Sequence, residues 1–140
     1  MSSAERTVAY ADTNVCVALL AGPAHPSHDE AIALFRRVAD GEVELIVVPV
    51  VVAELVYAAR TVLRWTTAEA ATRLQAFLAA VGLVVRDSPQ IFAALEVMGS
   101  RRIDFADAYL AAIALDPGPP VVASFDSDFD GIEGLRRIAG

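Results

Sequence analysis

Acidic residues recur at four places in the sequence, each at or just after the point where a predicted strand ends or a helix begins. Carboxylate oxygens are the ligands that Mg²⁺ and Mn²⁺ prefer, and two such ions can hold the attacking and leaving oxygens of a phosphoryl displacement. The indicated chemistry is therefore hydrolysis of a phosphate ester, as in a nuclease or phosphatase. The residues concerned are Asp12, Glu54, Asp104, Asp107, Asp126 and Asp128.

Simpler roles for these carboxylates remain open from the spacing alone. Asp104 and Asp107 lie in the first turn of a predicted helix, where the helix dipole stabilises an anion by about 0.3–1 kcal/mol. Asp12, Asp126 and Asp128 could serve as turn residues, which is the common role of Asp after a strand.

Glu54 is harder to explain in this way because its neighbours in the segment 50–56 are all apolar. An ionised carboxylate among apolar side chains carries a large desolvation cost unless it is paired. The nearest basic residue, Arg60, is six positions away, so an ion pair along the helix is not available. We therefore expect a counter-charge for Glu54, either an arginine from elsewhere in the fold or a metal ion.

Apolar strands that alternate with helices predict how these residues are positioned. Largely apolar runs such as 43–48, in which Glu44 is the one polar residue, are typical of strands buried on both faces, so the pattern predicts an α/β fold with a parallel sheet covered by helices. In such sheets, sites form beyond the carboxyl ends of the strands. The predicted strands are 7–11, 43–48, 83–86, 121–124 and 135–138, and the predicted helices are 14–21, 28–40, 50–65, 66–81, 88–98 and 104–115. Asn14 and Ser88 are the expected N-caps of two helices, and Thr66 with Glu69 forms a capping box.

Length and charge limit the function further. The 140 residues are expected to form one domain, 1–140, and 18 acidic against 11 basic residues give a net charge of −7, with arginine as the only basic type. Such acidity argues against a nucleic-acid partner. However, without the six candidate ligands twelve acids remain against eleven arginines, so the excess charge is concentrated in the predicted pocket. Metal ions between carboxylates and phosphates would make RNA binding compatible with this charge, and a basic inhibitor peptide would be attracted.

The remaining features favour a soluble, cytoplasmic protein. Cys16 is the one cysteine, so an intrachain disulfide and a thiolate metal cluster are excluded, and it is expected to be a small core residue. Residues 1–6 have no basic stretch followed by an apolar one, so no signal peptide is expected. The apolar stretch 45–53 is far shorter than the roughly 20 residues of a membrane span.

Four short motifs resemble one known family. They are Tyr-Ala-Asp-Thr-Asn at 10–14, Val-Ala-Glu-Leu at 52–55, Asp-Phe-Ala-Asp-Ala-Tyr-Leu-Ala-Ala at 104–112, and Ser-Phe-Asp-Ser-Asp-Phe at 124–129. In this order and spacing they resemble the PIN-domain ribonucleases, and among them the VapC-like toxins of toxin–antitoxin pairs. The resemblance implies a three-layer α/β/α fold with a central, mostly parallel sheet of about five strands. It also implies divalent-metal-dependent cleavage of single-stranded or looped RNA.

The resemblance assigns roles to individual residues. It implies that one or two Mg²⁺ or Mn²⁺ ions are held by a catalytic quartet, with further acids as supporting or alternative ligands and small polar residues that orient them. The quartet is Asp12, Glu54, Asp107 and Asp126, the supporting acids are Asp104 and Asp128, and the orienting residues are Thr13, Asn14 and Ser124. Candidates for contacts with the RNA backbone are Arg60, Arg64, Arg101 and Arg102. The implied partners are RNA, a VapB-like antitoxin and a second copy of the chain. Pro49 departs from the family, whose members often carry Ser or Thr there.

Three alternatives are weighed against this hypothesis. A catalytically degenerate relative would bind partners only. A receiver-like domain with an acidic Mg²⁺ pocket would need a lysine after its last strand, and the chain has no lysine. A phosphatase of the haloacid dehalogenase type would need a second acid where Asn14 follows Asp12-Thr13.

Overall fold

A three-stranded parallel sheet organises the first part of the fold. The computed structural model describes residues 5–140. β1 (Thr7–Tyr10), β2 (Val43–Val47) and β3 (Leu83–Val85) pair in the order β1-β2-β3, with Ala9 opposite Leu45 and Leu45 opposite Leu83. β2 lies in the middle and is buried except at the half-buried Glu44, which explains why the rest of its sequence is apolar.

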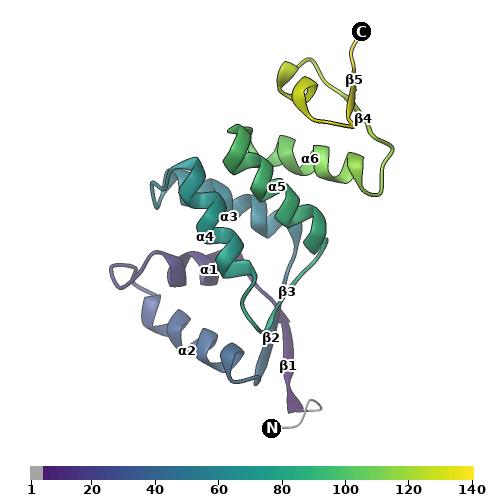
Figure 1. Cartoon of the computed structure of the whole chain (residues 1–140). Helices are drawn as coiled ribbons and strands as arrows, with labels where there is room; N and C mark the ends of the chain where they lie inside the picture. The colour runs from purple at the N-terminus through teal and green to yellow at the C-terminus, as the bar shows by residue number, and fades with distance from the viewer. Residues whose placement is uncertain (1–4) are drawn as a thin grey trace.

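Six α-helices accompany this sheet in the described part of the chain, and α5 and α6 lie beyond its end (Figure 1). α1 packs on α2 and α3, α4 packs on α3 and α5, and α5 packs along α6 (Figure 1). The helices are α1 (Thr13–Leu20), α2 (His28–Ala39), α3 (Pro49–Thr61), α4 (Thr67–Leu78), α5 (Ser88–Arg101) and α6 (Phe105–Leu115).

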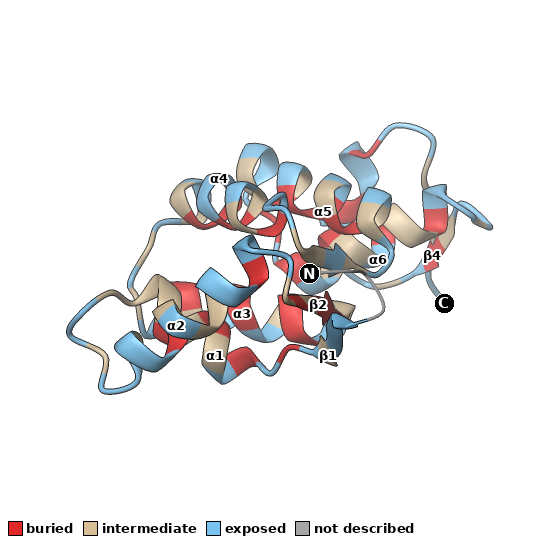
Figure 2. Ribbon diagram, turned by 90° about the horizontal axis from the view of Figure 1, so that it is seen from below, coloured by how far each residue is buried: buried red, intermediate tan, exposed pale blue. Residues whose placement is uncertain are grey.

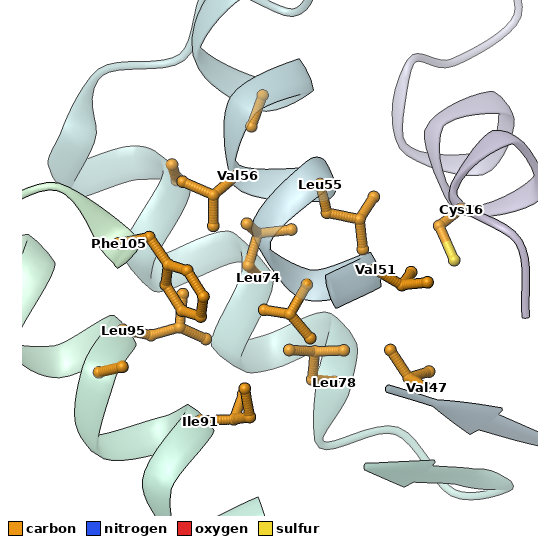
Figure 3. Close-up of a cluster of buried hydrophobic side chains, with 14 of the residues drawn as sticks. Cys16, Val47, Val51, Leu55, Val56, Leu74, Leu78, Ile91, Leu95 and Phe105 are labelled. Carbon is orange, nitrogen blue, oxygen red and sulfur yellow. The ribbon is translucent and has the colours of Figure 1, made fainter. Parts of the chain in front are cut away.

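The main core lies where α3, α4 and α5 meet β2. Leu55, Leu74, Ile91 and Leu95 are fully buried there and their aliphatic side chains pack together (Figure 3). Cys16 is buried at the edge of the same cluster, as expected. Burial and the nearby Asp12 carboxylate raise the pKa of its thiol to about 12.

A second, smaller sheet forms the C-terminal part. β4 (Val121–Ala123) and β5 (Arg136–Ile138) are parallel and are connected through a 3₁₀ helix, η2 (Ser127–Gly131). Val122 and Phe129 are buried in a separate apolar cluster with α6 residue Ala111. β4 and β5 lie on the side of α6 that faces away from β1 (Figure 1).

The α/β fold class with parallel strands is confirmed, but the single sheet of about five strands is wrong. The five strands are divided into a sheet of three and a sheet of two. β1 is an edge strand, and its Val8 and Tyr10 are exposed. α6 packs along α5, and β4 and β5 lie beyond α6 on the side away from β1. Apolar periodicity predicts that a strand exists but not which strand it pairs with.

Strand and helix limits agree with the predicted ranges to within one or two residues, with three larger differences. The helix predicted over 50–65 ends at Thr61, the helix predicted over 66–81 ends at Leu78, and the helix predicted over 88–98 continues to Arg101. Pro49 is the first residue of α3, where a missing backbone donor costs nothing. The predicted capping box is confirmed, since Thr66 Oγ1 accepts the Glu69 N–H and Glu69 Oε1 accepts the Thr66 N–H.

The two other predicted caps are wrong. Asp12, not Asn14, precedes α1 as its N-cap residue, and Asp87, not Ser88, precedes α5. Neither side chain makes a capping hydrogen bond. Sequence patterns locate helix ends only to within one or two residues. Each predicted cap is therefore a polar residue that lies one or two positions after the true N-cap residue.

Among the described residues, no helix is both long enough and apolar enough to cross a membrane. Residues 1–4, which begin the segment where no signal peptide is expected, lie outside the described part of the chain.

Candidate active site

The first group of predicted site residues lies where β1 ends and α1 begins. Asp12 is the exposed N-cap residue of α1, Thr13 is buried, and Asn14 is exposed. Thr13 and Asn14 line a groove of about 470 Å³ together with Glu54 and Tyr57 of α3. The groove therefore brings the first two motifs of the sequence onto one surface.

Glu54 does not need the counter-charge that its apolar neighbours predicted. The residue is exposed, whereas Val52 and Leu55 on either side of it are buried. Successive residues of a helix point about 100° apart, so one position in an apolar run can face solvent while its neighbours fill the core. The Glu54 carboxylate is therefore free to bind a ligand from solution.

A second group of carboxylates gathers at the start of α6 and in the loop after β4. Asp104 is the N-cap residue of α6 and Asp107 lies in its first turn, while Asp126 is the N-cap residue of η2. The pKa of Asp107 is raised by desolvation and then by the negative charges of Asp126, Asp104 and Asp128. The last two motifs of the sequence thus come together, and their charges repel one another.

Hydrogen bonds hold the loop that carries Asp126. Ser124 Oγ accepts the Asp126 N–H at 2.9 Å, and Asp126 Oδ1 accepts the Asp128 N–H at 2.8 Å. These bonds tie the Asp126 backbone and its carboxylate, through Oδ1, to the turn. The contact of Ser124 is the kind that its predicted orienting role requires.

Arg137 anchors the same loop from β5, although no motif in the sequence indicates this role. Its Nε donates to Asp130 Oδ1 at 2.7 Å and its Nη2 to Asp130 Oδ2 at 3.0 Å, while Nη1 donates to the Ser124 carbonyl at 3.2 Å. This pairing lowers the pKa of Asp130. The sequence alone does not predict the contact between Asp130 and Arg137, because this contact depends on the position of β5 beside β4.

The structure does not bring the predicted quartet together. Within residues 5–140, no three histidine, cysteine or acidic side chains are placed so that they could hold one ion. Asp12 and Glu54 belong to the part of the fold around β1 and α3, whereas Asp107 and Asp126 lie on α6 and beyond β4 (Figure 1). A site with all four ligands requires these two groups to approach each other.

The arginines predicted to contact RNA lie on two different elements. Arg60 donates to the Trp65 carbonyl at 2.8 Å, and Arg64 follows α3 with a left-handed φ of 58°. Arg101 ends α5, where its guanidinium lies close to Gly131, and Arg102 is the left-handed C-cap of that helix. All four are exposed, and α5 leads directly to Asp104.

The clustered charge predicts a gain in stability when Asp107 is neutralised. A carboxylate with a raised pKa in the folded state destabilises that state when it is ionised, and this cost disappears as the pH falls through the folded pKa toward the ordinary value of 3.8. In the metal-free protein at pH 7, we expect Asp107→Asn to have a higher free energy of unfolding than the wild type. The difference should shrink toward about pH 4. Urea unfolding in the presence of a chelator measures it, and a less stable variant at pH 7 would contradict the expectation.

The donor set fits a hard cation. All the candidate ligands are oxygen donors, the arrangement that Mg²⁺ and Mn²⁺ prefer over softer metals. The mutual repulsion around Asp107 is the kind that a divalent ion removes. The chemistry of the residues therefore suits such an ion, although they stand in two groups.

Comparisons with known proteins show similarity to a family model and to solved structures. The model of the PIN domain family matches residues 9–135. A crystal structure of VapBC2 from Rickettsia felis, bound to a DNA fragment from their promoter, contains a chain that is 18% identical; the alignment covers 96% of this chain and 99% of that chain, with a TM-score of 0.39. A search of curated protein sequences finds no match.

Proposed function

The chain belongs to the PIN domain family, and we propose that it is a divalent-metal-dependent ribonuclease that acts as the toxin of a toxin–antitoxin pair. The family predicted from four sequence motifs is thus confirmed over residues 9–135. The observation that supports catalysis most directly is the cluster of carboxylates around Asp107, where desolvation and the charges of Asp126, Asp104 and Asp128 raise the pKa of the Asp107 carboxyl.

In the proposed reaction, the ligands come from both groups of carboxylates. Asp107 and Asp126 would supply oxygens from α6 and from the loop after β4. Asp12 and Glu54 would supply oxygens from the start of α1 and from α3. A bound Mg²⁺ or Mn²⁺ supplies Lewis acidity toward the phosphate oxygens and toward the attacking water.

The chain's own residues carry the remaining tasks. Ser124 and Arg137 hold the loop that carries Asp126. Asp104 or Asp128, when not a ligand, would accept a hydrogen bond from the attacking water and orient it toward the phosphate. Thr13 and Asn14 would orient the part of the site that contains Asp12 and Glu54, because they line the same groove as Glu54.

Removal of metal tests the proposed ribonuclease. We expect the purified protein to cleave a fluorogenic single-stranded oligoribonucleotide in Mg²⁺ or Mn²⁺. Dialysis against EDTA should slow cleavage at least about a hundredfold, because the ion contributes several kcal/mol to the stabilisation of the transition state. Adding Mg²⁺ back should restore the rate. Cleavage that continues at the same rate in EDTA would contradict a metal-dependent mechanism.

The toxin role rests on the resemblance of the motifs to VapC-like proteins. The net charge of −7 and the acidic groups would attract an antitoxin with a basic segment, and such a segment could occupy the site in place of the metal and RNA. A homodimer is proposed on the same resemblance and is tested by sedimentation of the purified protein. Induction in bacterial cells, followed by mapping of new RNA 5′ ends, would identify the RNA that is cut.

A further inference from the structure

The first turn of α6 carries charges that repel one another but has no side-chain cap. The Asp107 carboxylate lies there within reach of the charges of Asp104, Asp126 and Asp128. Asp104 is the N-cap residue, a position where an Asp carboxylate commonly accepts a backbone N–H, but its side chain makes no capping hydrogen bond. Another contact therefore has to hold this turn in place against the repulsion.

Two aromatic side chains supply that contact. Phe105, the first residue of α6, is buried in the main core. Tyr109 lies one turn later, is half-buried, and stacks on the Phe105 ring with the ring centroids 5.9 Å apart and the ring planes 5° from parallel. The Tyr109 hydroxyl donates a hydrogen bond of 3.0 Å to Asp87 Oδ2. The first turn of α6 is thereby attached both to the core and to Asp87.

Asp87 serves as this anchor rather than as a helix cap. It is the second residue after β3 and directly precedes α5, and its backbone is left-handed with a φ of 53°. Such a backbone is uncommon for residues other than glycine. The Asp87 carboxylate makes no capping hydrogen bond to α5 and accepts the Tyr109 hydroxyl instead. The bond thus joins α6, which carries Asp107, to the segment that follows the three-stranded sheet.

We propose that Tyr109 is a positioning residue for the metal site: its bond to Asp87 fixes the first turn of α6, so that Asp107 keeps the direction in which it binds a divalent ion. This inference rests on the proposed metal-dependent function and deepens it by giving a role to a side chain that is not a ligand. Residues two apart on a helix point about 200° apart, so Tyr109 can hold α6 while Asp107 faces the other carboxylates. Tyr109 itself would touch neither the metal nor the RNA.

A purely structural role is the alternative, and a second bond between the same two helices provides the control. Gln90 Nε2 of α5 donates to the Asp116 carbonyl at 2.8 Å, at the end of α6 that is far from Asp107. Gln90→Ala therefore removes a contact between α5 and α6 without releasing the first turn, whereas Tyr109→Phe removes only the hydroxyl and keeps the stacked ring. Both variants should unfold at slightly lower urea concentrations than the wild type.

Mn²⁺ affinity is the deciding measurement, because it needs neither RNA nor cleavage. Electron paramagnetic resonance of free Mn²⁺ gives the dissociation constant of the purified protein. We expect Tyr109→Phe to raise this constant about 3- to 30-fold, less than the roughly 10- to 100-fold typical of losing a group that bonds a metal ligand directly. Gln90→Ala should stay within about twofold of the wild type. Equal affinity in Tyr109→Phe and the wild type would overturn the proposal, as would equal losses in the two variants.

Variants of Asp87 separate the hydrogen bond from the charge. Asp87→Asn loses the charge but keeps an oxygen that can accept the Tyr109 hydroxyl, so it should bind Mn²⁺ nearly as the wild type does. Asp87→Ala loses both and should match Tyr109→Phe, and the double variant should bind no more weakly than either single one. Losses that add in the double variant, or an Asp87→Asn protein as weak as Asp87→Ala, would contradict the hydrogen bond as the cause.

Cleavage kinetics give a second readout. At saturating Mg²⁺, Tyr109→Phe should lower kcat about 3- to 30-fold and leave the KM for a single-stranded oligoribonucleotide within about twofold, because no contact to the substrate is lost. A change confined to KM would place Tyr109 in the RNA-binding surface and overturn the positioning role. If the wild type bound no Mn²⁺, the proposed function would fall together with this inference, whereas a wild type that binds Mn²⁺ no more tightly than Tyr109→Phe would remove the inference alone.

Discussion

Replacing Asp107 by Asn is expected to reduce the rate of RNA cleavage at least about a hundredfold, and Asp12→Asn is expected to do the same. Each substitution removes a carboxylate charge but preserves the size of the side chain, so the fold should persist. The two residues belong to different groups of carboxylates in the structure. Equal losses in both variants would therefore indicate that the two groups act as one site during catalysis. Initial rates on a single-stranded oligoribonucleotide measure the effect.

Asp116→Asn is the matched control for these variants. Asp116 follows the opposite end of α6, is exposed and is not a proposed ligand, so its neutralisation should leave the rate within about twofold of the wild type. Circular dichroism should show all three variants folded. Full activity in Asp12→Asn or Asp107→Asn would remove that residue from the catalytic set. In cells, the new RNA 5′ ends that follow induction of the wild type should be absent after induction of Asp12→Asn.

Leu74→Ala is expected to lower the free energy of unfolding by about 2–5 kcal/mol. Leu74 lies on α4 with 0% of its surface exposed, in the cluster where α3, α4 and α5 meet (Figure 3). The substitution removes buried methyl groups and leaves a cavity that the surrounding helices can fill only in part. Chemical denaturation monitored by circular dichroism measures the change.

Leu110→Ala provides the same substitution at a surface position. Leu110 lies on α6 and is 47% exposed, so less apolar area returns to water and no closed cavity forms. We expect a cost of about 1 kcal/mol or less. If the two leucine variants lost equal stability, the α3–α4–α5 cluster would not be the main core.

The sequence predicted the elements better than their assembly. The largely apolar run 43–48 became the buried central strand β2, and the Thr66–Glu69 capping box begins α4 as expected. These features depend on neighbouring residues, so local patterns are sufficient to find them. Which strands pair side by side depends on contacts between segments that are distant in sequence, and no local pattern encodes those contacts. Figure 2 shows that the helices carry both buried and exposed residues along their length.

The candidate site was predictable in its residues but only partly in its arrangement. Asp104 and Asp107 were expected near Asp126 and Asp128, and the charges of these residues do act on one another in the structure. The solvent exposure of Glu54 was not foreseen, since the apolar composition of its segment hides the rotation of the helix. The Asp130–Arg137 pair was missed because it depends on where β5 lies.

The buried thiol of Cys16 makes the chain convenient for spectroscopic labelling. With a pKa of about 12 and no exposed surface, this cysteine should not react with maleimide or methanethiosulfonate reagents at neutral pH. Cysteines introduced at the exposed positions Val50 and Ser127 would then carry the only labels. A pair of spin labels at these positions would report the distance between α3 and the loop after β4, and its change when Mg²⁺ and RNA are added.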